Sequence, residues 1–107
     1  MQKAVFQHFG VPTRAKSPGE TYMAAMKLYL TDPAKHPYSI EFLRFEPGSP
    51  LPKAIQTTPH VAYSVPNLEA AIKGKQVVLE PTPVGEDMRI AFIKDGDALI
   101  EVMEIKS

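Results

Sequence analysis

The sequence predicts an α+β fold in which one strand-rich unit occurs twice. A histidine begins an apolar run at His8 and again at His60. A later apolar run opens with an Ile-Glu pair at Glu41 and again at Glu101. The second half of the chain shows a β-α-β-β-β pattern. With 107 residues the chain forms one domain, and each half is too small to bury a core alone, so we expect the two copies to share one.

The second half carries the clearer signals. Residues 60–65 read as a strand, and Asn67 is placed as the N-cap of a short helix, with Gly74 as its C-terminal stop. Prolines and glycines mark loops after the helix. The pattern predicts a helix over 68–73, strands over 76–80, 88–94 and 98–105, and connections over 81–87 and 95–97.

The first half is predicted to lack one strand of this pattern. Residues 4–11 read as a strand, and a loop over 13–20 takes the place of the helix. Residues 22–31 fit neither period cleanly, and we interpret them as one strand that pairs with a strand over 38–45. Three prolines and a glycine make 48–59 the natural linker. The predicted organisation is module one at about 1–48, a linker at about 49–58 and module two at about 59–107.

Composition excludes several functions. Twelve basic and twelve acidic residues balance, which argues against nucleic acid or an anionic membrane surface as a partner. The absence of cysteine excludes disulfides, thiolate metal sites and cysteine nucleophiles. The first ten residues lack the apolar stretch of a signal peptide, and no run is long enough to span a bilayer. We expect a cytoplasmic protein.

Both glutamates fall on apolar faces of predicted strands. Because side chains alternate along a strand, Glu101 shares its face with Leu99 and Met103. Glu41 likewise shares a face with Leu43 and Phe45. An ionised carboxylate on such a face is costly unless it is paired or bound to metal. One such glutamate is most commonly a solvated charge on an edge strand. Two glutamates in the same sequence pattern favour a functional role.

The histidines complete a candidate site. His60 alternates with the small residues Ala62 and Ser64, and His8 shares its face with Gly10. Either histidine alone would most commonly be a half-buried hydrogen-bonding residue. His36 lies in a predicted turn, where we expect it to be exposed, and is excluded. Two imidazoles and two carboxylates suit Zn, Ni, Co, Mn or Fe(II) and leave positions open for substrate. Strand pattern alone does not separate such a site from a buried ion network.

The quoted residues resemble a known family. His60-Val61-Ala62-Tyr63-Ser64-Val65, Leu68-Glu69-Ala70-Ala71 and the run from Arg89 to Glu104 are similar to the second module of the glyoxalase, bleomycin resistance and dioxygenase (vicinal oxygen chelate) superfamily. The first half is similar through His8 and Glu41 with their flanks. The resemblance implies paired βαβββ modules that curl into a cup around a divalent metal, here with the first-module helix reduced or absent. The implied metal ligands are His8, Glu41, His60 and Glu101.

The resemblance also implies an activity. The His-Glu-His-Glu set is similar to that of glyoxalase I, a lyase that moves a proton beside a metal-bound carbonyl or enediolate oxygen of a small molecule. Glu101 is then the expected base and Glu41 the second candidate. The alternative is a metal-free drug- or metabolite-binding protein of the bleomycin-resistance type. A dioxygenase using His8, His60 and Glu101 is less favoured, because Glu41 would occupy a position that oxygen needs.

The same resemblance suggests further contacts. Arg14 and Arg89 are candidates to meet an anionic group of the substrate, although either residue type is more commonly a surface charge. Tyr63, Phe92 and Met103 are candidate pocket residues that at strand spacing are more commonly core. Small proteins of this kind often complete their cups by association, so a homodimer is one expectation, and the sequence leaves open whether the two modules pair within one chain or across two.

Overall fold

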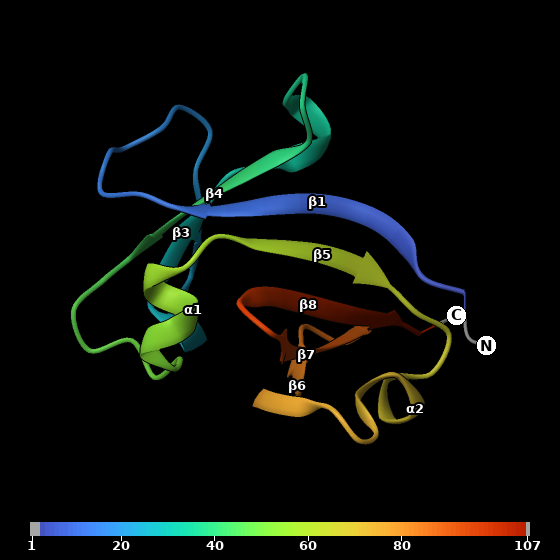
Figure 1. Cartoon of the computed structure of the whole chain (residues 1–107). Coiled ribbons are helices and arrows are strands. Elements are labelled where there is room, and N and C mark those ends of the chain that lie inside the picture. The colour runs from blue at the N-terminus through green and yellow to red at the C-terminus, as the bar shows by residue number, and fades with distance from the viewer. Residues whose placement is uncertain (1–2, 107) are drawn as a thin grey trace. The chain divides into compact units, whose positions relative to one another are not determined.

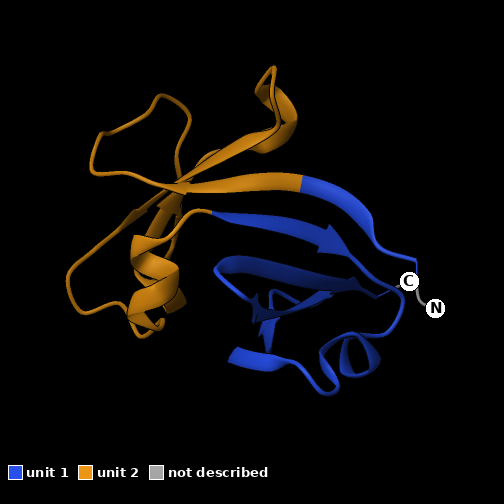
Figure 2. Ribbon diagram, in the orientation of Figure 1, with its two compact units in different colours: residues 1–7, 60–107 blue, residues 8–59 orange. Residues whose placement is uncertain are grey.

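The computed structural model describes residues 3–106 and divides into two compact units (Figures 1 and 2). Of the described residues, unit 1 comprises 3–7 and 60–106, and unit 2 comprises 8–59. The first strand, β1 (Val5–Pro12), contributes residues to both units. The described residues form eight strands and few short helices, so the predicted α+β class is confirmed.

Unit 1 has the β-α-β-β-β order that its sequence predicts. Its strands lie in the order β5-β8-β7-β6, with β5 parallel to β8 and the other pairs antiparallel. Tyr63 of β5 also meets the ring of Phe6 edge-on, at 6.0 Å between centroids. The elements of this unit are β5 (His60–Ser64), α2 (Leu68–Ile72), β6 (Gln76–Val84), β7 (Met88–Asp95) and β8 (Ala98–Ile105).

Helix α2 forms where the capping signals predict it. The Asn67 side chain accepts a hydrogen bond from the Ala70 amide, and Gly74 takes a φ of +75° just past the helix end. The helix covers one face of the unit 1 sheet. Its buried Leu68 packs with Val102 of β8 and Ala91 of β7. The predicted N-cap and C-terminal stop are therefore confirmed.

Strand β6 is longer than predicted. It continues to Val84 through Pro81 and Pro83, which the sequence analysis assigned to a connection over 81–87. Prolines are tolerated here because β6 is the last strand in the order and so has a free edge. The pairing with β7 shifts register between Val77 and Thr82, as expected where a ladder is interrupted.

Unit 2 is built on four strands without a covering helix over residues 13–20, as predicted. Strand β4 runs parallel to β1 and antiparallel to β3, and the order is β2-β3-β4-β1. The elements that follow β1 are β2 (Thr21–Met23), the 3-10 turn η1 (Ala24–Met26), β3 (Leu28–Leu30), the 3-10 turn η2 (Pro33–Lys35), β4 (Ile40–Phe45) and helix α1 (Lys53–Thr57).

The prediction of a single strand over 22–31 is wrong. The segment is a hairpin: β2 and β3 pair across η1, and Lys27 turns the chain with a φ of +50°. The Lys27 amide donates to the Ala24 carbonyl, which closes the turn. Lysine rarely adopts this left-handed conformation. Because the turn residue is not glycine or asparagine, the sequence does not indicate a turn at this position. The first half is consequently not one strand short.

The segment predicted as a linker has structure of its own. It carries helix α1, in which Ile55 is 1% exposed. Ser49 Oγ donates to the Met26 carbonyl, and Gln56 Nε2 donates to the Leu51 carbonyl. These contacts fix residues 49–57 to unit 2. Within residues 3–106, no helix combines the length and the apolar character that a bilayer crossing would need.

Candidate metal centre

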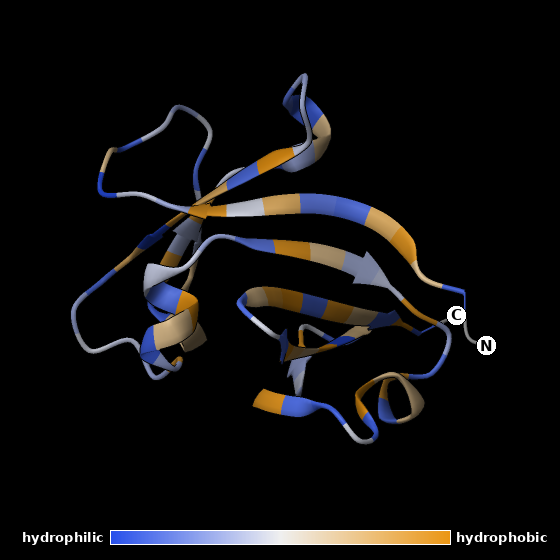
Figure 3. Cartoon of the chain, in the orientation of Figure 1, coloured by the Kyte–Doolittle hydropathy of each residue, from blue (hydrophilic) through white to orange (hydrophobic). Residues whose placement is uncertain are grey.

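In unit 1, His60 and Glu101 form a buried pair. His60 Nε2 lies 3.1 Å from Glu101 Oε1, and the two side chains are 1% and 10% exposed. The Phe92 ring meets the His60 ring edge-on at 4.9 Å between centroids, which restricts the imidazole's orientation. The pair is on the sheet face opposite α2, because Glu101 alternates with Val102, which packs under the helix. Figure 3 shows β8 as a largely hydrophobic ribbon interrupted by hydrophilic bands.

In unit 2, His8 and Glu41 form the corresponding pair. His8 Nε2 lies 3.4 Å from Glu41 Oε1, and the side chains are 7% and 14% exposed. His36, which the sequence analysis excluded, is not part of this pair. It is half-buried rather than exposed, because its ring lies edge-on to Phe42 and its Nδ1 accepts a hydrogen bond from the Tyr38 amide.

The two pairs are built by the same local geometry. Glu41 is registered with Gly10, two residues after His8, on the parallel strands β1 and β4. Glu101 is registered with Ala62, two residues after His60, on the parallel strands β5 and β8. Residues two apart on a strand share a face, so each glutamate lies diagonal to its histidine. Gly10 and Ala62 are small and buried, which leaves room for the carboxylates.

The donor atoms suit a divalent metal ion. Ligand atoms at about 2.1 Å from one ion are about 3.0 Å apart at a right angle and about 3.4 Å apart at the tetrahedral angle. The observed nitrogen-to-oxygen distances of 3.1 and 3.4 Å match these separations. His8 in unit 2 and His60 and Glu101 in unit 1 are all buried, and their imidazole and carboxylate groups are of the kind that could hold a metal ion. Glu41 is not one of these buried residues and is the most exposed of the four predicted ligands.

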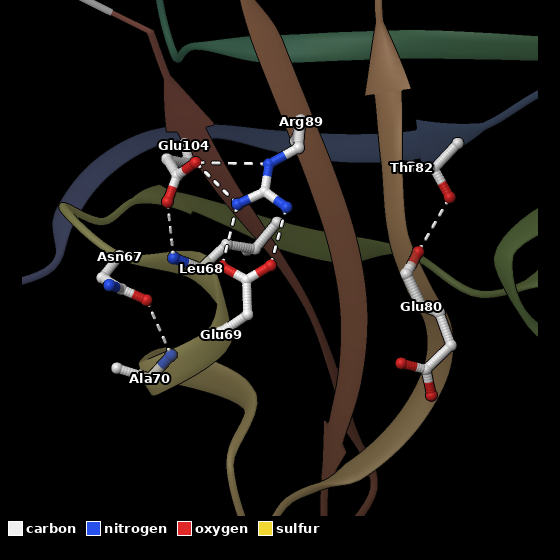
Figure 4. A network of polar contacts seen from close by, with 8 residues as sticks. All are labelled: Asn67, Leu68, Glu69, Ala70, Glu80, Thr82, Arg89 and Glu104. Atoms are coloured by element: carbon white, nitrogen blue, oxygen red, sulfur yellow. Dashed lines mark hydrogen bonds and ion pairs between the residues drawn. The ribbon is translucent and has the colours of Figure 1, made fainter.

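Arg89, a candidate substrate contact, is engaged within unit 1. Its guanidinium donates to both oxygens of Glu69 on α2, at 2.6 and 2.8 Å, and to Oε1 of Glu104 on β8, at 2.8 Å (Figure 4). Glu104 also accepts from the Leu68 amide at the start of α2. This network holds the helix on the sheet face opposite the His60–Glu101 pair. Arg14, the second candidate, is exposed in the loop after β1.

The network has a clear electrostatic signature. The bidentate contact with Arg89 lowers the pKa of Glu69 to about 2. Hydrogen bonds from the Leu68 amide and from Arg89 lower the pKa of Glu104 below its ordinary value. Sequence analysis missed this role because the acidic partners come from two separate elements. The sequence offered one signal of this role. Arg89 alternates with Ile90 and Phe92, so its side chain lies on the face of the sheet that the helix covers.

The three candidate pocket residues have different positions. Phe92 is buried against His60, so it belongs to the surroundings of the pair. Met103 is registered with Ser64 and shares the face of Glu101. Tyr63 is half-buried on the opposite face and contacts Phe6. Phe92 and Met103 therefore share the sheet face of the His60–Glu101 pair, and Tyr63 does not.

Comparison with known proteins supports the fold. No protein-family model matches the sequence, and no curated protein matches it. A solved structure, that of hypothetical protein BH1468 from Bacillus halodurans C-125, is similar with a TM-score of 0.67 and 19% sequence identity. The similarity covers 97% of this chain and 96% of that chain. At this level of identity the likeness shows a shared fold and says nothing about activity.

Proposed function

We propose that this protein is a metal-dependent lyase or isomerase of the glyoxalase type, in which His8, Glu41, His60 and Glu101 hold one divalent ion. The observation that carries the proposal is the duplication of a buried His–Glu pair at the same register in both units. A small residue, Gly10 in unit 2 and Ala62 in unit 1, is registered with the glutamate of each pair. A metal site assembled from a duplicated unit requires that repetition.

The donor set defines the kind of ion. Imidazole nitrogens and carboxylate oxygens suit Zn, Ni, Co, Mn or Fe(II), and four protein ligands leave room for a substrate oxygen on a six-coordinate ion. A bound ion of this kind supplies Lewis acidity, which makes a carbon next to a carbonyl more acidic. This chain's part is to hold the donors, to exclude water and to move the proton.

Glu101 is the residue we assign to proton transfer. Its side chain is 10% exposed, and the buried Phe92 packs against the neighbouring His60 ring. A carboxylate in such a site can take a proton from the carbon beside the carbonyl and return it to the neighbouring carbon, which completes an isomerisation without a redox partner. His60 fixes the position of Glu101 Oε1 at 3.1 Å. Glu41, in the equivalent position of unit 2, is the alternative base.

The test follows proton transfer directly. The full chain, loaded in turn with Zn, Ni, Co and Mn, is incubated in deuterium oxide with the hemithioacetal of methylglyoxal and glutathione. Proton NMR then measures formation of the thioester and deuterium incorporation. We expect turnover with at least one metal, and a loss of about a hundredfold or more in Glu101→Gln. Glu86→Gln, an exposed acid in the turn before β7, is the matched control and should retain full rate.

Two outcomes would count against the proposal. Equal rates in Glu101→Gln and the unaltered chain would remove Glu101 from the reaction. If no metal supports turnover, and if the hemithioacetal binds equally well with and without the ion, the metal-free binding protein would be favoured instead.

A further inference from the structure

The internal repeat points to a second site in unit 2. In unit 1, Ile100 and Val102 flank Glu101 and pack under helix α2, on the face opposite the His60–Glu101 pair. Their counterparts in unit 2 are Ile40 and Phe42, which flank Glu41. Unit 2 has a loop over residues 13–20 where unit 1 has its helix. Residues 13–20 therefore place no α-helix on the corresponding sheet face, and the short 3-10 turn η2 contacts β4 there instead.

A cleft occupies that face. Its volume is about 430 Å³, within the range of small-molecule sites, and all of its lining residues belong to unit 2. Ile40 and Phe42 of β4 supply an apolar floor. Ser17 of the loop, Thr21 of β2 and Lys35 of η2 are on the polar rim. An apolar floor with a few polar groups around it is the usual composition of a site for a small organic ligand.

The rim is rich in hydrogen-bond donors. His36 Nδ1 accepts a hydrogen bond from the Tyr38 amide at 3.0 Å, which places the proton of the neutral ring on Nε2 and makes that nitrogen a donor. Thr31 Oγ1 accepts from the Phe42 amide, so its own hydroxyl proton is available to another acceptor. Lys35 adds an ammonium group. Asp32 also lines the cleft, with Oδ1 engaged by the Ala34 amide.

We infer that this cleft binds a small carboxylate with an aromatic or aliphatic body, on the sheet face opposite the His8–Glu41 pair. The apolar part would lie on Phe42 and Ile40, and the carboxylate would accept hydrogen bonds from Lys35 and the neighbouring donors. The inference does not rest on the metal proposal, because no lining residue of the cleft is one of the four proposed ligands.

The experiment uses phenylacetate as the anionic probe and benzyl alcohol as its neutral counterpart. Each is titrated into the nitrogen-15-labelled full chain, and amide shifts are followed by NMR. The chain is first treated with chelator, so that a carboxylate bound to a metal ion does not contribute. We expect saturable shifts that gather at Thr31, His36 and Phe42 with phenylacetate, and affinity at least about tenfold weaker for benzyl alcohol.

Two variants locate the probe. Lys35→Gln should weaken phenylacetate binding about tenfold, and Ser17→Trp should abolish it by filling the cleft. Lys53→Gln, an exposed lysine of the same unit on α1, should leave the affinity unchanged. Shifts scattered over the chain, no saturation, or equal weakening by Lys35→Gln and Lys53→Gln would overturn the site. Equal affinity for the two probes would overturn the preference for an anion.

Discussion

His60 Nε2 and Glu101 Oε1 lie 3.1 Å apart on neighbouring parallel strands, and Ala62, the residue registered with Glu101, is 0% exposed. The distance and the small neighbour belong together, because a larger side chain at position 62 would occupy the space that the carboxylate uses. The same relationship holds between His8 and Glu41 beside Gly10. This shared geometry leads to the first prediction.

Ala62→Leu should disturb the pair and the fold together. Overpacking a fully buried position typically costs about 1 to 3 kcal/mol of unfolding free energy, and the displaced Glu101 should bind metal less tightly. Urea unfolding and calorimetric metal titration measure the two effects. Ala70→Leu, on the exposed side of α2, is the control and should change neither. Unaltered metal affinity in a destabilised Ala62→Leu protein would separate Ala62 from the site.

Asn67→Ala should loosen helix α2. Loss of the hydrogen bond from the Ala70 amide to the Asn67 side chain should lower the unfolding free energy by about 1 kcal/mol. Asn67→Ser, which keeps an N-capping oxygen, should restore most of the loss. Thermal or urea unfolding followed by circular dichroism measures both variants. Equal stability of the alanine and serine variants would contradict the capping role.

Acid should weaken the Arg89 network in a defined pH window. The folded-state pKa of Glu69 is lowered to about 2 from 4.5, so its contribution to stability is present above about pH 4.5 and is lost as the pH falls toward 2. Glu104 shifts in the same direction. The melting temperature of Arg89→Gln should therefore lie below that of the unaltered chain near pH 6.

That gap should narrow as the pH falls from 5 to 2. The effect is limited by solvent screening, because the Glu69 side chain is 60% exposed. Lys75→Gln removes a positive charge from an exposed position after α2 and serves as the control. A gap between Arg89→Gln and the unaltered chain that stays constant over this range would show that the carboxylates do not titrate against Arg89.

Sequence patterns predicted the second half of the chain well because its signals are local. The N-cap at Asn67, the positive φ at Gly74 and the alternation along β8 each act within a few residues. The hairpin of β2 and β3 was missed because its turn residue is Lys27, which gives no local sign of a left-handed backbone. The extension of β6 was missed because an edge position, which tolerates proline, is defined only by the whole sheet.

The candidate site shows the same division. Alternation along the strands placed Glu101 on an apolar face and His60 on the face of the small residues Ala62 and Ser64, and both side chains are buried. Each glutamate lies diagonal to its histidine because of the register between paired strands. The sequence pattern does not reveal which strands pair or in what register. The engagement of Arg89 and the cleft over Ile40 and Phe42 also arise from elements that are far apart in the chain.

The central claim is that two histidine and two glutamate donors hold a single ion. Its most direct test is the metal content of the full chain purified without chelator, measured by elemental analysis beside Glu41→Ala and Glu101→Ala. We expect one divalent ion per chain and a marked loss in both variants, although the two residues belong to different units. Absence of metal, or two ions per chain of which each variant loses only one, would contradict the account.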